Sequence, residues 1–245
     1  MRGFCLVSAA IPGSPYDPIV EVTWPRMEAY AKRWEMDFLP YEPSVAEVDY
    51  FSDNEAPPGT GADYASIPWQ TYLMYTRYKG IVFMDADVLV VDGTYDICRE
   101  VTDNVPIGAV VQELTEDPAS VFPNWGVVVG RGPVFRSFLQ SQWDMRHSYR
   151  LHPWLEQAAA MELIGYDPDD HPGCHWVGGG PFSHAFGKLS PRWNWGPRSE
   201  PLNVCDTDES FNTPLFFHPT GLKLCDKIAL INEYASASNE RQHNG

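Results

Sequence analysis

The segment Ile81-Val82-Phe83-Met84-Asp85-Ala86-Asp87-Val88-Leu89-Val90-Val91 places two carboxylates, one residue apart, between two apolar runs. The runs are short, β-branched and aromatic, which is typical of a buried strand. An ionised carboxylate inside such a strand costs free energy unless it has a charge partner. We therefore expect the chain to leave the sheet at Asp85, so that both acids stand at the carboxyl end of the strand, where α/β sheets bind ligands. Two acids on one bend can share a divalent cation, which suggests a metal–diphosphate site.

The order of the remaining elements indicates one α/β domain. Apolar runs predict strands at residues 4–9, 37–40, 81–91, 107–112 and 125–130. Helical spacing and capping residues predict helices at residues 24–34, 67–78, 133–146, 153–164 and 226–235. Because strands and helices alternate through the first half, we expect a mostly parallel, doubly wound sheet flanked by helices.

Three other stretches carry no strand or helix pattern. Residues 41–64 are rich in proline, glycine and acids and predict a surface loop. Residues 167–212, dense in proline, glycine and tryptophan, predict irregular structure that closes over a site. The length fits a single domain over residues 1–235, and we expect the polar tail, residues 236–245, to be disordered.

Composition limits the class of partner. The formal net charge of −16 argues against nucleic acid and anionic membranes as partners. Five widely spaced cysteines without CxxC spacing favour a reducing compartment. The sequence has no apolar run of about 18 residues and no signal-peptide pattern. We therefore expect a soluble, cytoplasmic protein with no membrane segment.

Five blocks follow one another along the chain in a particular order. They are Asp85-Ala86-Asp87, Phe122-Pro123-Asn124-Trp125-Gly126-Val127, Glu156-Gln157-Ala158, Leu189-Ser190-Pro191-Arg192-Trp193-Asn194 and His218-Pro219-Thr220-Gly221-Leu222-Lys223. This series resembles the GT-A glycosyltransferases, particularly the retaining families typified by glycogenin-like and bacterial galactosyl and glucosyl transferases. It is also similar to the fungal and plant α-galactosyl/xylosyltransferase group. The resemblance spans residues 3–230 and implies a Rossmann-like GT-A fold with an irregular C-terminal acceptor region.

The resemblance implies a metal site. Asp85 and Asp87 correspond to the DxD pair in the turn that includes Ala86, with Asp87 as the firmer metal ligand and Asp85 shared between the metal and the ribose of the donor. His218 corresponds to the histidine that completes the metal shell. Carboxylates, an imidazole and ligand oxygens suit Mn²⁺ or Mg²⁺. Such an ion stabilises the charge that develops on a diphosphate leaving group.

The same resemblance implies which residues surround the donor sugar. Asn124 and Gly126 match an Asn-x-Gly turn beside the sugar. Glu156 and Gln157 resemble an acidic–glutamine pair that faces the sugar ring, where the reacting carbon becomes oxocarbenium-like. A carboxylate or carboxamide there can stabilise positive charge.

Four more residues are candidates for contacts with the substrates. Gly221 and Lys223 match the region of a phosphate-binding lysine, although Lys223 lies five residues after the histidine where the families have six. Trp193 matches a Trp-Asn pair near the acceptor side. Tyr16 follows the first strand, and a ring at the carboxyl end of a strand is positioned to stack on the base of a nucleotide.

The sequence also departs from the families it resembles. They often carry a basic residue in the helix before the DxD strand, where this chain has the neutral Ser66 and Gln70. Trp125 stands in the Asn-x-Gly block where a small residue is usual.

Other classes of function remain open at this point. A haloacid-dehalogenase-like phosphatase also ends a strand with Asp-x-Asp, but normally after the first strand and with Thr or Val at the position of Leu89. A nucleotidyltransferase needs a basic, glycine-rich loop after the first strand, and Ile11–Tyr16 holds one glycine and no Arg or Lys. A non-catalytic nucleotide-sugar or glycan-binding module is the third alternative. The prediction is a metal-dependent glycosyltransferase that moves a sugar, with retention, from a nucleotide-sugar donor, with UDP expected, to an acceptor hydroxyl.

Overall fold

The computed structural model describes residues 2–44, 47, 61–113, 121–169, 176–196 and 214–243. The strands are β1 Arg2–Ala9, β2 Asp37–Tyr41, β3 Tyr78–Met84, β4 Leu89–Val90, β5 Ile107–Glu113, β6 Val121–Arg131, β7 Phe186–Leu189 and β8 Phe216–Phe217. The helices are α1 Asp17–Arg33, α3 Gly61–Thr76, α4 Gly132–Asp144, α5 Arg146–Tyr149, α6 Leu155–Ile164 and α7 Leu224–His243. The short 3₁₀ helices are η1 Ile97–Glu100, η2 Ser183–Ala185 and η3 Pro191–Asn194.

The central sheet has six strands in the order β2-β1-β3-β6-β5-β7. β1 pairs in parallel with β2 and β3, and β5 pairs in parallel with β7. β6 is antiparallel to both of its neighbours, β3 and β5, so it alone runs against the other five strands. The predicted mostly parallel sheet is therefore confirmed, with β6 as the exception.

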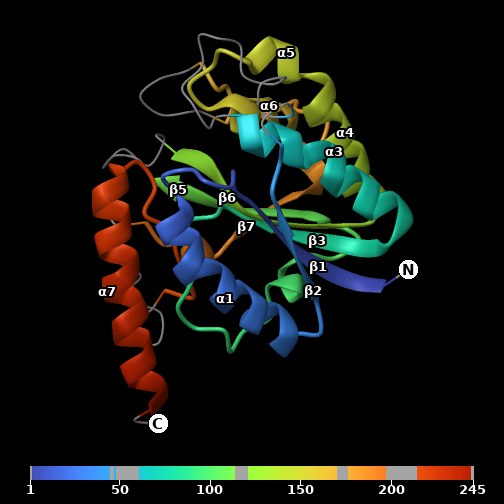
Figure 1. The fold of residues 1–245 in the computed structure, drawn as a ribbon. Coiled ribbons are helices and arrows are strands. Elements are labelled where there is room, and N and C mark those ends of the chain that lie inside the picture. The colour runs from blue at the N-terminus through green and yellow to red at the C-terminus, as the bar shows by residue number, and fades with distance from the viewer. Residues whose placement is uncertain are drawn as a thin grey trace.

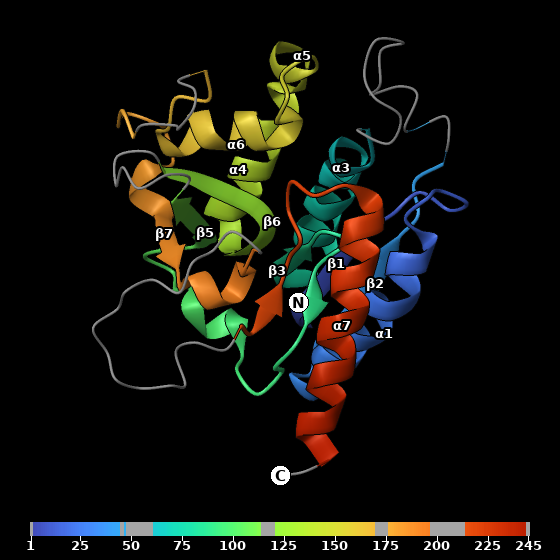
Figure 2. The ribbon, with the colours of Figure 1, turned by 90° about the vertical axis from the view of Figure 1, so that its left-hand side faces the viewer.

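Helices cover both faces of this sheet (Figure 1). α3, α4 and α6 lie on one face, whereas α1 lies on the other and α7 packs alongside α1 (Figure 2). Alternate residues of β3 face the two layers: Ile81 and Phe83 join the core under α3, α4 and α6, and Val82 and Met84 join the core under α1. The strand reads as a continuous apolar run because both of its faces are buried.

The chain leaves the central sheet after Met84, as predicted. β4 follows the acidic turn and belongs to a separate two-stranded sheet with β8, in which Leu89 pairs with Phe217. His218 comes directly after β8. The small sheet therefore brings the C-terminal part of the chain to the turn that carries Asp85 and Asp87.

The predicted element boundaries are wrong in several places. α1 begins at Asp17 instead of residue 24, with a proline in its first turn, and α3 begins at Gly61 instead of residue 67. Thr23 does not cap α1: its hydroxyl donates to the carbonyl oxygens of Ile19 and Ala86. Tertiary contacts of this kind override a local capping signal.

The C-terminal end of the chain also differs from the prediction. α7 continues through His243, into the polar tail for which the sequence predicts disorder from residue 236. Ser238 is buried and accepts a hydrogen bond from Arg26 of α1. β7 forms an edge strand inside the stretch predicted to be irregular, while residues 170–175 and 197–212 of that stretch, and residues 45, 46 and 48–60 of the predicted surface loop, lie outside the described residues. None of the helices in the described part of the chain has the length and apolar character needed to cross a membrane.

Candidate metal centre

Three hydrogen bonds that involve backbone atoms of residues 85–88 hold the acidic turn in place. The Asp85 amide donates to the Gly126 carbonyl of β6 at 2.9 Å, and the Val88 amide donates back to the Asp85 carbonyl at 3.0 Å. The Thr23 hydroxyl of α1 donates to the Ala86 carbonyl at 2.7 Å. The turn therefore presents the Asp85 and Asp87 side chains on a fixed backbone, at the carboxyl end of β3.

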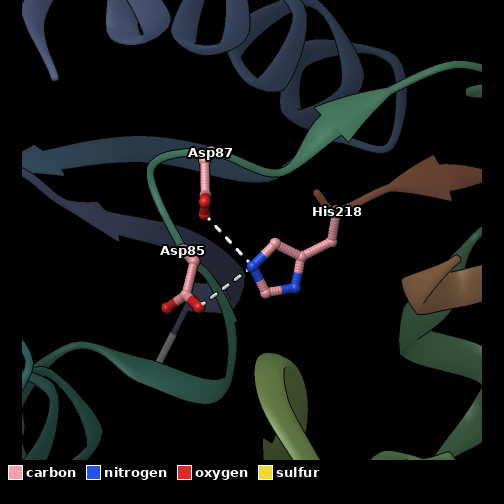
Figure 3. A group of neighbouring side chains, drawn as sticks. All are labelled: Asp85, Asp87 and His218. Carbon is pink, nitrogen blue, oxygen red and sulfur yellow. Dashed lines mark ion pairs between the residues drawn. The ribbon is translucent and has the colours of Figure 1, made fainter. Parts of the chain in front are cut away.

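Asp85, Asp87 and His218 point toward one another at this edge of the sheet (Figure 3). The Nε2 atom of His218 lies 3.2 Å from Oδ1 of Asp87 and 3.5 Å from Oδ2 of Asp85. One ligand atom from each residue falls within 4.8 Å of the others. Among the described residues this is the one group of three acidic, histidine or cysteine side chains that converges in this way.

Hydrogen bonds on the far side of the imidazole fix its orientation. The Asn194 amide nitrogen donates to Oδ1 of Asn124 at 2.9 Å, which leaves the Asn194 Oδ1 to accept from Nδ1 of His218 at 2.9 Å. The Thr220 hydroxyl also lies 2.9 Å from that nitrogen. A proton on Nδ1 leaves the lone pair of Nε2 directed at the carboxylates, which is the arrangement of a metal-binding histidine.

The pKa values of the cluster reflect burial and close charges. Removal from water raises the pKa of Asp85 to about 6. Burial also acts to raise the pKa of Asp87, but the charges of His218 and Lys227 prevail and hold it below its usual value. Burial acts to lower the pKa of His218, and the two carboxylates prevail and raise it. Asp87 and His218 are therefore buried members of a charged cluster, while the Asp85 side chain stays 31% exposed at its rim.

Lys227 is a fourth charged member of the cluster. Its ammonium lies 2.5 Å from Oδ2 of Asp87, and both side chains are almost fully buried, with exposed fractions of 12% and 6%. Burial acts to lower the pKa of Lys227, but Asp87 prevails and raises it, so that the ammonium stays charged. Sequence reasoning missed this residue. The available signal was its place early in the predicted helix after His218.

The Asn-x-Gly block forms a bulge inside β6. Val110 pairs with Asn124, and the preceding residue of β5 pairs with Val128, so residues 125–127 are extra on the β6 side. Gly126 lies in this bulge against the cluster. A Cβ atom there would come 2.2 Å from the His218 ring and 2.8 Å from the Asp85 carboxylate. Only glycine fits this position.

Asn124 is a structural member of the site. It is buried, its Oδ1 accepts from the Gly126 amide at 2.9 Å, and its amide nitrogen donates to Gln112 of β5 at 3.0 Å. Gln112 in turn donates to the Asn194 carbonyl at 3.0 Å. Gln112 did not stand among the predicted site residues, and Asn194 was predicted only as the partner of Trp193 in the Trp-Asn pair near the acceptor side. The network joins the bulge to the residues that orient His218.

Glu156 and Gln157 lie in the first turn of α6, on the other side of the bulge. The Gln157 carboxamide oxygen accepts from the Trp125 amide at 3.0 Å, so this side chain reaches the bulge next to the cluster. Glu156 lines a small cavity of about 20 Å³, together with Ser66 and Gln70. Gln70 donates to the Ser66 hydroxyl at 3.0 Å, so the two neutral positions satisfy each other.

The structure places the remaining candidates at different distances from the cluster. Tyr16 is 37% exposed at the carboxyl end of β1, and the Lys227 ammonium lies 5.7 Å from its ring. Gly221 has a φ of +73°, which turns the chain from His218 into α7. Lys223 is exposed just before α7. Trp193 lies in the core under α1, packed edge-on against a phenylalanine of β8, and is not brought to the carboxylates.

The donor set fits a hard divalent cation. Two carboxylates and one imidazole offer oxygen and nitrogen atoms to a single point and leave the remaining coordination positions to a ligand. The hydrogen bonds behind His218 supply the outer support that such ligands need.

Comparisons with known proteins give matches by structure. No protein-family model matches the sequence, and no curated protein matches it. A glycosyltransferase involved in the glycosylation of the major capsid of PBCV-1 matches with a TM-score of 0.60 at 15% identity, with 95% of this chain and 100% of that chain covered. The galactosyltransferase LgtC, solved in complex with donor and acceptor sugar analogs, matches with a TM-score of 0.59 at 14% identity over 96% of each chain.

A third structure, the glycosyltransferase GlyE of Streptococcus pneumoniae, matches with a TM-score of 0.52 at 12% identity, over 97% of this chain and 63% of that chain. At such low identity, likeness of structure establishes the fold and leaves the activity to the site. The predicted GT-A glycosyltransferase fold is therefore confirmed.

Proposed function

We propose that this chain is a metal-dependent glycosyltransferase that uses a nucleotide sugar, with UDP as the nucleotide, and transfers the sugar to an acceptor hydroxyl with retention. The observation that carries the proposal is the convergence of Asp85, Asp87 and His218 at the carboxyl end of β3. That edge of an α/β sheet is where ligands bind, and the fold is that of glycosyltransferases.

The roles of the cluster follow from its charges. Asp87 and His218 would hold Mn²⁺ or Mg²⁺, and Asp85 would share its carboxylate between the metal and the ribose. A bound ion of this kind supplies Lewis-acid stabilisation to the departing diphosphate. The glycine in the bulge lets the His218 ring and the Asp85 carboxylate pack directly against the β6 backbone.

In the proposed transfer, one bond to the anomeric carbon of the sugar breaks and another forms. The bond from this carbon to the phosphate oxygen breaks with its electron pair, which stays on the diphosphate. A bond from the acceptor oxygen forms on the same face, and the acceptor proton passes to the departing phosphate oxygen. In this proposal Gln157 and Glu156 face the sugar ring and stabilise the positive charge that develops on it.

The test is a calorimetric titration of the purified protein with UDP, with and without Mn²⁺, repeated with GDP and CDP. We expect UDP to bind only with Mn²⁺ and more tightly than GDP or CDP, since the metal offsets the repulsion between the acidic protein and the diphosphate. Binding must be followed by turnover, measured as release of UDP from UDP-sugars in the presence of a panel of sugar acceptors.

Two variants locate the binding to the cluster. Asp87→Asn should abolish Mn²⁺-dependent UDP binding, and His218→Ala should weaken it with the fold retained in far-UV circular dichroism. The matched control is Asp103→Asn, whose carboxylate is 87% exposed and precedes β5, at the opposite edge of the sheet. Unchanged UDP affinity in Asp87→Asn would overturn the site assignment.

A non-catalytic nucleotide-sugar-binding module is the second candidate. The pocket beside the bulge favours it, since Ser66 and Gln70 hydrogen-bond to each other and supply no cation for a diphosphate. Mn²⁺-dependent UDP binding without release of UDP from any UDP-sugar would support this alternative. Activity on a generic phosphate ester, lost in Asp85→Asn, would instead support a phosphatase.

A further inference from the structure

Each oxygen of the Asp87 carboxylate has its own side-chain partner. Oδ1 lies 3.2 Å from Nε2 of His218, and Oδ2 lies 2.5 Å from the ammonium of Lys227. The ion pair with Lys227 is almost completely shielded from solvent. A charge-assisted bond in such a place is strong, because water does not compete for either partner.

Lys227 is brought to this position by the path of the chain after His218. Gly221, with its positive φ, turns the backbone into α7, and the Lys227 amide then donates to the Lys223 carbonyl within the first turn. The ammonium lies between Asp87 and the exposed ring of Tyr16. Lys227 thus stands at the edge of the cluster that faces the nucleotide side of the proposed site.

The Lys227 ammonium and a metal ion would compete for the same carboxylate, that of Asp87. A divalent ion held by Asp85, Asp87 and His218 would neutralise the two carboxylates, so the charge of Lys227 would be left over. A buried ammonium beside a divalent cation is repelled unless an anion joins them.

We propose that Lys227 is an exchangeable cation: it neutralises Asp87 in the metal-free site and transfers its ammonium to the diphosphate when metal and nucleotide bind together. This inference rests on the proposed function. Lysine suits the exchange because its ammonium is a point charge with three donors on a flexible four-carbon stem. A diphosphate next to the metal offers oxygens to the ammonium on the side of Tyr16.

This role predicts that removal of Lys227 has opposite effects on the affinity for Mn²⁺ and on the affinity for the nucleotide. Without Lys227, the metal no longer competes with an internal cation, so Mn²⁺ alone should bind more tightly. The nucleotide, in contrast, loses a cationic partner and should bind the metal-loaded protein less tightly. A residue that merely positions Asp87 would weaken both constants when removed, and a residue unrelated to the site would change neither.

The experiment titrates Mn²⁺ alone into the protein, followed by UDP in saturating Mn²⁺, for wild type, Lys227→Met and Lys79→Met. Lys79→Met is the matched control, because it removes the same charge from an exposed position at the amino end of β3, away from the cluster. We expect Lys227→Met to bind Mn²⁺ about tenfold more tightly and UDP about tenfold or more weakly, as for a buried like-charge pair and a lost phosphate contact. Lys79→Met should leave both affinities within about twofold of wild type.

Lys227→Gln serves as the second neutral variant if the methionine variant does not fold. Weaker or unchanged Mn²⁺ binding in the variant that folds would overturn the exchange, as would unchanged UDP affinity. Equal tightening of Mn²⁺ binding in Lys79→Met would assign the effect to general charge and overturn it as well. Failure of the proposed function is distinguishable, because wild-type protein would then bind no UDP in Mn²⁺ at all.

Discussion

At the scale of single residues, Gly126 decides whether the cluster can form. A methyl group at this position would meet the Asp85 carboxylate and the His218 ring, and the ring is fixed by its own hydrogen bonds. We expect Gly126→Ala to cost about 1–3 kcal/mol of stability, as overpacking does, and to weaken Mn²⁺ binding at least tenfold. Gly3→Ala is the control, because a Cβ there meets nothing within 4 Å. Wild-type Mn²⁺ affinity in Gly126→Ala would contradict the assignment.

The raised pKa of His218 makes metal binding depend on pH. The carboxylates keep the imidazole protonated to higher pH than usual, and the metal binds only after this proton leaves. Lower pH therefore favours the proton over the metal, and the Asp85 carboxyl, with a pKa of about 6, adds a second competing proton. We expect the Kd for Mn²⁺, measured by calorimetry, to rise at least about tenfold from pH 8 to pH 6. Equal Kd values would remove His218 from the metal shell.

Glu156 and Gln157 belong to the reaction step in the proposed function. We expect Glu156→Gln and Gln157→Ala to lower kcat more than they lower UDP-sugar affinity, because the charge on the sugar ring exists only in the transition state. The comparison is kcat from UDP release against UDP Kd from calorimetry. Losses confined to UDP affinity would instead place these residues in donor binding.

At the scale of elements, an arginine of α1 ties down the distal part of α7, which also packs through apolar side chains. Arg26 donates to the Ala235 carbonyl at 2.8 Å, to the Ser238 hydroxyl at 2.9 Å and to the Asn239 side chain at 2.6 Å. These bonds fix the distal part of the helix that carries Lys227. They explain why the chain beyond residue 235 is helical where its polar sequence predicts disorder.

Substitution of Arg26 should therefore lower the stability of the folded protein. We expect Arg26→Met to lower the free energy of unfolding by about 1–3 kcal/mol, since hydrogen bonds to a charged group are lost. Urea denaturation is the measurement. Lys32→Met, an exposed residue of the same helix, should change the free energy by less than about 0.5 kcal/mol. Equal effects of the two substitutions would show that the Arg26 contacts do not anchor α7.

At the scale of the whole molecule, the site joins segments from both ends of the chain. The turn after β3, the bulge in β6 and the start of α7 meet at one cluster, and α7 also packs against α1. We propose accordingly that residues 1–235 unfold as one domain. Ligand bound at the cluster would then stabilise all of these segments together.

Thermal unfolding tests this arrangement. Mn²⁺ with UDP at 100 times its Kd adds about 2.7 kcal/mol, which corresponds to roughly 5–10 °C in Tm for a chain of this size. We expect tryptophan fluorescence and far-UV circular dichroism to shift together by this amount, with Asp87→Asn showing no shift. Two separate transitions, of which only one moves, would contradict a single cooperative domain.

The sequence by itself determined the local features of this protein. The apolar run before Asp85 specified a buried strand, and the carboxylates after it specified where the strand ends, because neither effect depends on distant residues. Most helices could likewise be predicted from the local sequence alone. Their boundaries were not, since the start of α1 and the length of α7 depend on contacts made by Thr23 and Arg26 with other elements.

Only the tertiary structure decided which distant side chains meet. Resemblance to a family suggested His218, but the Asn194 and Asn124 amides that orient it and the Lys227 ion pair follow from the pairing of β8 with β4 and the packing of α7. The tertiary structure alone likewise decided the reversed direction of β6 and the edge position of β7. Local propensity is a property of neighbouring residues, whereas strand pairing and side-chain networks are chosen by the burial of surface across the whole domain.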